Sequence, residues 1–263
     1  MWSWDTRKAM QISQLNGNLV VRFTDYINGQ PFFSFLGDNM VNETAEALLE
    51  LSKREGLPLE LKLVPEIAVR EINLDKFKVI EDKDNSDYIY ETLSLKEMKG
   101  NKFNTRRGEA HRFSRNYDNF RVEVLDIFKS KQELVELTNM WFENKKRSVE
   151  VKDFGNEQIA IDRFFSYNIN SDKMFILGLF LDDRLVGYIV NELLPNKNSM
   201  LHFDKTDLSI NGAHSYLMKA NAEMLLEKNV SCINYEQDLG LLPLQRSKRS
   251  FRPNNFLNKF IIK

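Results

Sequence analysis

The sequence predicts an α+β protein made of two units in tandem, each with a mixed, mostly antiparallel sheet flanked by helices. The first observation is the order of apolar patterns in residues 122–263, which is helix, helix, three strands, helix, strand, helix, strand. The second is that residues 10–81 repeat this order without the two leading helices. Because both halves share one element order, we expect two similar layered units.

The second half carries the clearer pattern. Apolar residues recur at spacings of three and four in residues 131–146, which is typical of an amphipathic helix. Two dense apolar runs meet at Asp182-Asp183, which indicates a hairpin. The expected elements are helices at 131–146 and 158–169, strands at 174–181, 184–194 and 199–206, a helix at 213–228, a strand at 231–235, a short basic helix at 242–250 and a strand at 256–262.

The first half has sharper turn signals. Asn16-Gly17-Asn18 separates two strand-like runs, as in a hairpin turn. Gly56 follows an amphipathic run and is expected to end a helix. The expected elements are strands at 10–15, 19–25 and 31–36, a helix at 42–55, a strand at 57–64, a short helix at 65–72 and a strand at 77–81.

The element order of the second half is that of the GNAT fold, the fold of many N-acetyltransferases, so we expect two tandem GNAT-like units. Residues 1–86 would form the N-terminal unit, without leading helices, and residues 122–263 the C-terminal unit. Residues 87–121 would form a basic connector, with a hinge near residues 82–87. The alternative is a single α+β domain with one larger sheet.

Composition limits the classes of function. The net charge is −1, so nucleic acid would have to bind to a local basic patch. The single cysteine, Cys232, lies in an apolar run, where we expect a core residue in a reducing compartment. Three histidines lie without ligand spacing, so no metal site is expected. The apolar runs are too short to span a bilayer and the first residues lack a signal-peptide pattern, so we expect a cytoplasmic protein.

One local basic patch lies in residues 96–121, which contain eight cationic and three acidic residues. Aromatic residues such as Phe103 and Tyr117 alternate with these cations. Guanidinium groups bind phosphate oxygens in pairs and flat rings stack on bases, so the segment is a candidate site for a polyphosphate or an RNA end. The alternative is an amphipathic connector helix with core aromatics and solvated cations. The cations are Lys96, Lys99, Lys102, Arg106, Arg107, Arg112, Arg115 and Arg121.

A second charged group follows the expected strand at 231–235. Glu236 and Asp238 alternate along its continuation, so they point to opposite faces unless a bulge intervenes. One carboxylate could face a cleft as a general base while the other braces a cation. The alternative is a salt-bridge cluster that fixes the last helix. The cations that follow are Arg246, Lys248, Arg249 and Arg252.

The segment at 201–214 bears on coenzyme A. A GNAT enzyme that uses acetyl-CoA has a glycine-rich turn here, whose backbone N–H groups bind the pyrophosphate. This chain has LSINGAH at 208–214, with Gly212 as its one glycine and no cation. This argues against coenzyme A. His202 is expected to be a satisfied residue of the sheet, with a role as a base as the alternative.

Two signatures resemble those of soluble bacterial proteins related to the C-terminal domain of phosphatidylglycerol lysyltransferase. The first comprises DYIYET at 87–92 and GNKFNTRRG at 100–108. The second comprises YEQDLG at 235–240 and LQRSKRSFRP at 244–253. Gly108 stands where the family pattern has asparagine, and Gln245 stands where it has arginine.

The resemblance implies tandem GNAT-like domains and transfer of an aminoacyl group from aminoacyl-tRNA. The lysyltransferase passes this group to a lipid hydroxyl, and the similar Fem-type peptidyltransferases pass it to an amine. We therefore expect an acyltransferase whose donor is aminoacyl-tRNA and not coenzyme A. Its acceptor would be an unidentified lipid, peptide or small molecule.

The resemblance also implies roles for particular residues. Glu236 or Asp238 would accept the proton of the nucleophile or orient the group that does, and Lys248 would stabilise the oxyanion or hold the tRNA end. The expected phosphate-binding residues are Lys102, Arg106, Arg107, Arg246, Arg249 and Arg252. Two alternatives stay open: an acetyl-CoA-dependent N-acetyltransferase, and a binding or scaffold protein that has kept the fold without the reaction.

Overall fold

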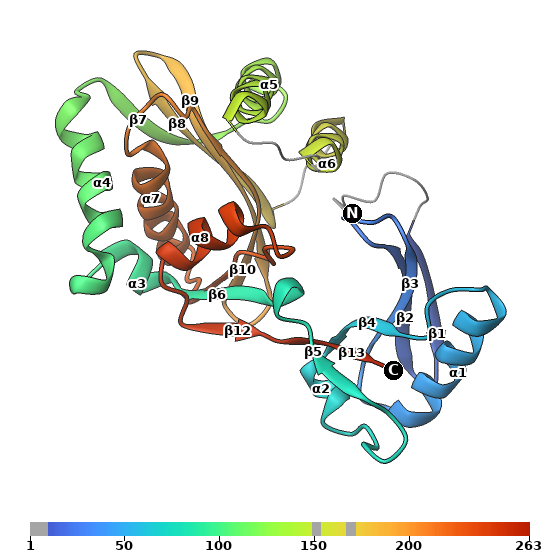
Figure 1. Cartoon of the computed structure of the whole chain (residues 1–263). Helices are drawn as coiled ribbons and strands as arrows, with labels where there is room; N and C mark the ends of the chain where they lie inside the picture. Colours follow the sequence, from blue (N-terminus) through green and yellow to red (C-terminus); the bar gives the residue numbers. More distant parts are fainter. Residues whose placement is uncertain (1–9, 149–153, 167–171) are drawn as a thin grey trace. The chain divides into compact units, whose positions relative to one another are not determined.

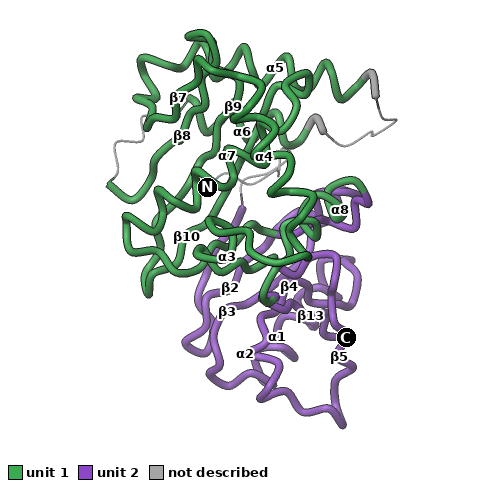
Figure 2. The backbone as a smooth tube through the Cα atoms, turned by 90° about the vertical axis from the view of Figure 1, so that its left-hand side faces the viewer, with its two compact units in different colours: residues 1–2, 88–236, 243–255 green, residues 3–87, 237–242, 256–263 purple. Residues whose placement is uncertain are grey.

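The computed structural model describes residues 10–148, 154–166 and 172–263, which fall into two compact units (Figures 1 and 2). In the part described, unit 1 comprises residues 88–236 and 243–255. Unit 2 comprises the residues up to 87 together with 237–242 and 256–263. Unit 2 is therefore assembled from three separate stretches of the chain.

Unit 1 is built on a seven-stranded sheet with the strand order β12-β6-β11-β10-β9-β8-β7. β10 and β11 run parallel, whereas the pairs β6–β11, β9–β10, β8–β9 and β7–β8 are antiparallel. The strands are β6 (Asp87–Glu91), β7 (Phe120–Leu125), β8 (Met174–Leu181), β9 (Arg184–Leu194), β10 (Asn198–Thr206), β11 (Cys232–Asn234) and β12 (Asn255–Leu257).

Helices cover both faces of this sheet (Figure 1). Tyr188 of β9 points to the α5–α6 face, where its hydroxyl lies 2.8 Å from that of Thr138. A Cβ atom on its neighbour Gly187 would lie 2.9 Å from Leu217, on the α7 face. The helices are α3 (Thr92–Glu97), α4 (Asn104–Asn116), α5 (Lys131–Ser148), α6 (Phe154–Ser166), α7 (Ala213–Glu227) and α8 (Leu242–Ser250), with a 3₁₀ turn η2 (Asn101–Phe103).

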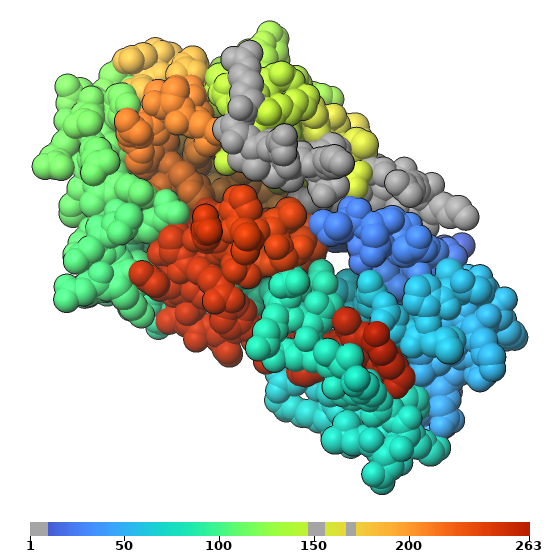
Figure 3. Space-filling model, viewed as in Figure 1, coloured from blue at the N-terminus to red at the C-terminus, as the bar shows by residue number. Residues whose placement is uncertain are grey.

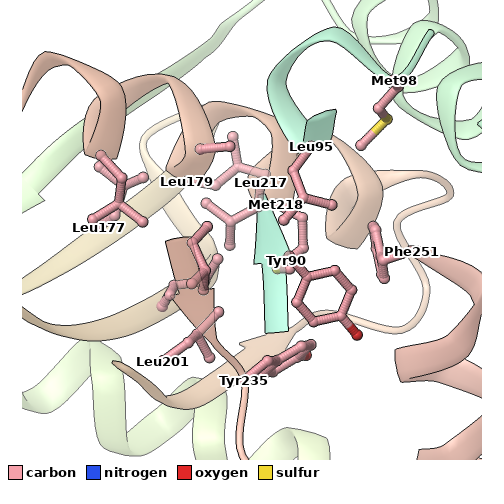
Figure 4. Packing of buried hydrophobic residues seen from close by; sticks show 14 of the residues in the cluster. Tyr90, Leu95, Met98, Leu177, Leu179, Leu201, Leu217, Met218, Tyr235 and Phe251 are labelled. Atoms are coloured by element: carbon pink, nitrogen blue, oxygen red, sulfur yellow. The ribbon is translucent and has the colours of Figure 1, made fainter. Parts of the chain in front are cut away.

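The core of unit 1 lies mainly between the sheet and the helices α3, α4 and α7. Leu177, Ile189 and Leu217 are fully buried in it. Tyr90, Tyr235 and Phe251 extend the same cluster toward α8 (Figure 4). Burial of this apolar area is the main stabilising term of the unit, and it fixes the strand ends on which the polar site is built.

Unit 2 has a six-stranded sheet with the order β1-β2-β3-β4-β13-β5. Helix α1 packs on it through Val41, Ala45 and Leu48, which recur at helical spacing and are buried. The elements are β1 (Gln11–Leu15), β2 (Asn18–Thr24), β3 (Pro31–Leu36), α1 (Val41–Arg54), β4 (Leu61–Pro65), α2 (Glu66–Val69), β5 (Val79–Glu81), η1 (Lys83–Asn85) and β13 (Lys259–Ile262).

The prediction of an α+β protein with two mixed sheets flanked by helices is confirmed, and both units are GNAT-like. The expected last strand at 256–262 differs, because it is split into β12 and β13. β13 pairs with β4 and β5 of unit 2, so the end of the chain completes the sheet formed by the N-terminal half. Its buried residue, Ile262, belongs to the core of unit 2.

Residues 87–121 fold as β6, α3, η2, α4 and the start of β7, and residues 88–121 belong to unit 1. The strand expected at 57–64 begins only at Leu61. The helix expected at 65–72 is a single turn, Glu66–Val69. The expected end of the helix at 158–169 lies outside the described residues, as does the start of the chain. The boundaries after residues 86 and 121 stay predictions.

Candidate active site

β10 of unit 1 pairs with its parallel neighbour β11 over only part of its length. β10 pairs with β11 along Asn198–Met200, opposite Cys232–Asn234. β11 then ends, whereas β10 continues to Thr206 along β9. The β9–β10 register shifts between Leu201 and Phe203, so His202 lies in a β-bulge. Bulges redirect side chains near functional sites, and the polar residues of unit 1 gather where this pairing ends.

The first group at this point is a histidine between two carboxylates. Nε2 of His202 lies 2.8 Å from Oε2 of Glu192, and Nδ1 lies 3.0 Å from Oε1 of Glu236. The imidazole is 10% exposed and each carboxylate 33%. Burial disfavours the imidazolium, but the hydrogen bonds and charges of Glu236 and Glu192 outweigh it and raise the pKa of His202. The site can therefore both donate and accept a proton.

Glu236 reaches the histidine through an unusual backbone conformation. Its φ is +53°, in the left-handed region that non-glycine residues seldom adopt. Two hydrogen bonds hold it there: its N–H donates to Oδ1 of Asn234 at 2.8 Å, and its carbonyl accepts from the N–H of Tyr88 at 3.1 Å. The expected strand continuation through 236–238 was therefore wrong, because β11 ends at Asn234 and the chain turns. Strained residues of this kind cluster at functional sites.

The second group is centred on Asp204 of β10. Its Oδ2 lies 2.8 Å from Nε2 of His214 in the first turn of α7. Burial raises the pKa of Asp204, but the adjacent His214, the charge of Lys205 and the Tyr235 hydroxyl outweigh it and hold that pKa well below its ordinary value. Burial and the neighbouring carboxylate raise the pKa of Tyr235 well above its usual range, so Tyr235 is a neutral donor.

Lys248 of α8 lies against the same tyrosine. Its side chain is buried, and its ammonium donates to the main-chain carbonyl of Tyr235. The ammonium also lies 4.5 Å from the centre of the Tyr235 ring. The Lys248 carbonyl accepts from the Tyr90 hydroxyl at 2.8 Å, which ties α8 to β6. A desolvated cation at a strand end can stabilise negative charge that develops beside it.

Arg106 of α4 contacts Ser250 at the end of α8 and the ring of Phe251. Its guanidinium donates to the Ser250 hydroxyl at 2.7 and 2.5 Å and pairs with Glu109 at 2.8 Å. It also lies 4.5 Å from the ring centre of Phe251, and His214 contacts the same ring edge-on at 5.2 Å. Phe251 thus links Arg106 to His214, the histidine beside Asp204.

The other expected phosphate-binding residues divide into two kinds. Arg107 is partly buried and donates to the carbonyls of Met98 and Gly100, at 2.6 and 3.2 Å, so it holds the α3–α4 turn. The others are exposed: Lys102, Arg246, Arg249 and Arg252. Of these, Arg252 donates through Nε to the carbonyl of Lys102 at 2.8 Å, which brings the two cations together.

Of the two expected carboxylates, Glu236 belongs to unit 1 and Asp238 to unit 2. Asp238 is 1% exposed, and its Oδ1 accepts from the N–H of Gly240 at 2.8 Å, as in a tight turn. Within unit 1 the structure brings together Arg106, Lys248 and the segment before Glu236 through Tyr235 and α8.

The sequence pattern predicts His202 as a satisfied residue of the sheet and indicates no role for Glu192, Asp204, His214 or Tyr235. One signal was available, since His202 and Asp204 stand two residues apart on a strand that directly precedes a helix start. The partner of His202 from β9, Glu192, lies ten residues earlier and becomes a neighbour only through the hairpin.

The helix start at Gly212 has a structural explanation. Gly212 has φ +85°, and a Cβ atom there would lie 2.2 Å from the carbonyl oxygen of Glu109 in α4. Close packing of α4 on α7 therefore explains the glycine at this position. A bound pyrophosphate is not needed to explain it. The observation weakens the case for coenzyme A, because the space beside this glycine is filled by the protein's own backbone.

The chain belongs to the family described as phosphatidylglycerol lysyltransferase, C-terminal, whose pattern it matches over residues 1–263. The predicted resemblance is thereby confirmed. An uncharacterized protein of Mycoplasmoides gallisepticum is 18% identical over 179 residues, which is 68% of this chain and 56% of that protein. The match thus spans little more than half the length of this relative.

Solved structures share the fold of this chain. A conserved protein of unknown function from Bacteroides thetaiotaomicron superposes with a TM-score of 0.80 at 23% identity, over 96% of this chain and 85% of that one. The C-terminal domain of a putative lysylphosphatidylglycerol synthetase from Agrobacterium fabrum gives 0.66 at 13% identity, over 96% and 83%. FemX gives 0.53 at 10% identity, over 96% and 87%. Unit 1 and unit 2 therefore have an acyltransferase-type fold.

No helix among the described residues combines the length and the apolar character needed to cross a bilayer.

Proposed function

We propose that the chain transfers an aminoacyl group from aminoacyl-tRNA to an amine or hydroxyl acceptor, and that the Glu192–His202–Glu236 group moves the protons. The observation that carries this is the imidazole held on both nitrogens by carboxylates, at 2.8 and 3.0 Å, where β10 and β11 cease to pair. Family membership supports the reaction class. The donor, the acceptor and the residue roles are inferred from that membership and from this geometry.

The transfer needs one proton accepted and one donated. The acceptor nitrogen or oxygen bonds to the acyl carbon, and the ester bond to the ribose oxygen breaks. Glu236 takes the proton from the acceptor and gives it to the leaving ribose oxygen, so the carboxylate ends as it began. The His202 imidazolium donates one N–H to Glu192 and the other to Glu236, and it thereby orients the Glu236 carboxylate. Despite its burial, the hydrogen bonds and charges of Glu236 and Glu192 raise the pKa of His202 and so favour the imidazolium form.

Other residues stabilise the negative charge of the intermediate or position the groups around it. Lys248 stabilises the oxyanion of the tetrahedral intermediate from its buried position beside Tyr235. Arg106 orients α8 through Ser250 and Phe251, and it is a positioning residue in this scheme. The exposed cations Lys102, Arg246, Arg249 and Arg252 remain our candidates for phosphate contacts. Asp238 has a turn-stabilising bond of its own, so Glu236 is the preferred carboxylate.

Two binding measurements separate the donors. Filter binding of charged tRNA should weaken steeply as salt rises, because it would rest on phosphate contacts. Calorimetry with acetyl-CoA should give no micromolar signal, since α4 packs against Gly212. Clear acetyl-CoA binding together with salt-indifferent tRNA binding would replace this proposal with the N-acetyltransferase. If neither donor binds, the scaffold protein is favoured.

A further inference from the structure

The solvent face of α4 contains a mid-helix glycine that nothing in the described chain explains. Gly108 has helical neighbours on both sides, is exposed, and a Cβ atom there would have no heavy atom within 4 Å. Glycine in a helix interior costs about 1 kcal/mol relative to alanine. The close packing that requires glycine at Gly212 is absent here. No contact within the described structure therefore explains why Gly108 is a glycine.

Cations lie on the same helical face. Arg112 and Arg115 follow Gly108 by four and seven residues, which places all three on one side of the helix. Both arginines are exposed, and no acidic side chain of the described residues forms an ion pair with either. The stretch from Lys102 to Arg115 contains five cations and one acid, Glu109, in a chain of net charge −1.

The apolar residues of α4 rule out one use of this face. Ala110 and Phe113 are buried in the core of unit 1. Of the large apolar residues that the structure describes as exposed, none lies between 101 and 116. A helix that lies in a membrane interface needs bulky apolar side chains to insert, and this helix presents none. The face is polar and cationic, and α4 lies at the surface of unit 1 (Figure 3).

We propose that this α4 face, defined by Thr105, Gly108, Arg112 and Arg115, is the docking surface for the sugar–phosphate backbone of an RNA. The glycine lets the backbone approach the helix, and the two arginines bind its phosphate oxygens through paired N–H groups. The inference rests on the proposed function for the identity of the RNA as tRNA. It adds a surface whose residues differ from those around His202, and it gives a use to the glycine that departs from the family pattern.

The test measures binding of uncharged tRNA, so that it does not depend on transfer. The double variant Arg112→Ala/Arg115→Ala should bind about tenfold more weakly, and the slope of log K against log salt should fall by about 1.4–1.8 for two lost phosphate contacts. Gly108→Gln should also weaken binding while leaving thermal stability unchanged or higher. The control Lys129→Ala/Lys131→Ala removes the same charge from exposed positions near the start of α5 and should bind like the wild type.

Three outcomes would overturn the inference: a double variant that binds tRNA like the wild type, a wild type that binds no tRNA, and a wild type that binds phosphatidylglycerol vesicles but not tRNA. The proposed function fails differently. A wild type that binds tRNA through this face but transfers no aminoacyl group would keep the docking surface and remove the reaction.

Discussion

His202 Nδ1 lies 3.0 Å from Oε1 of Glu236, and this contact joins a bulged residue of β10 to a left-handed residue just after β11. A β-bulge at His202 and a positive φ at Glu236 are both uncommon backbone conformations for non-glycine residues. Their coincidence at the point where two parallel strands cease to pair indicates that the contact is built into the fold.

The charge of His202 should make stability depend on pH. Because the folded pKa is raised, the imidazolium stabilises the protein fully below the unfolded value of about 6.5, and this contribution is lost as pH rises through the folded pKa. The free energy of unfolding of the wild type, minus that of His202→Gln, should therefore decrease between pH 6 and pH 9. Urea denaturation at several pH values measures it, and a difference that grows with pH would contradict the assignment.

Gly212→Ala should destabilise unit 1 much more than Gly100→Ala. Both glycines have nearly equal positive φ values, +85° and +84°, so both variants strain the backbone alike. At Gly212 the new Cβ would also lie 2.2 Å from the Glu109 carbonyl, whereas at Gly100 it meets nothing. We expect an additional cost of about 1–3 kcal/mol from this overpacking. Equal unfolding free energies for the two variants would refute the close α4–α7 contact.

Arg106→Lys should loosen α8. An ammonium cannot make two N–H contacts to Ser250 and stack on Phe251 at once, so we expect a loss of about 1–2 kcal/mol in unfolding free energy. Arg115→Lys, on the exposed side of the same helix, serves as the matched control and should have no measurable effect. Amide hydrogen exchange in residues 242–250 should speed up in Arg106→Lys alone. Unchanged exchange would show that Arg106 does not hold this helix.

Lys248→Met should keep the fold but lower its stability. The variant removes the donor to the carbonyl of Tyr235, and leaving a buried acceptor unpaired costs about 1–3 kcal/mol. Lys131→Met, at an exposed position, should change stability by less than about 0.5 kcal/mol. A Lys248→Met protein as stable as the wild type would mean that this lysine is not a structural donor.

Much of the fold follows from local pattern. The apolar runs meeting at Asp182-Asp183 correctly predict β8 and β9, and the spacing in 131–146 predicts α5. The pairing of β13 with β4 was missed, because which sheet a terminal strand joins depends on contacts about two hundred residues apart. Residues 87–91 were missed as a strand for a similar reason, since β6 is fixed by pairing with β11.

The candidate site was only partly predictable. Glu236 and Lys248 stood out by charge, but a period of two placed Glu236 on a strand that in fact ends at Asn234. Glu192 could not be found, because nothing local marks it and the β9–β10 hairpin alone brings it to His202. Arg107 matched a family signature, yet its guanidinium is used on main-chain carbonyls.

Single-turnover transfer from aminoacyl-tRNA to a nucleophilic acceptor such as hydroxylamine tests the central claim most directly. We expect His202→Gln and Glu236→Gln to lower the rate about 10²–10⁴-fold while charged-tRNA binding stays at the wild-type level. The matched variant Glu133→Gln, an exposed carboxylate on α5, should transfer at the wild-type rate. Transfer by His202→Gln at the wild-type rate would contradict the role of the Glu192–His202–Glu236 group.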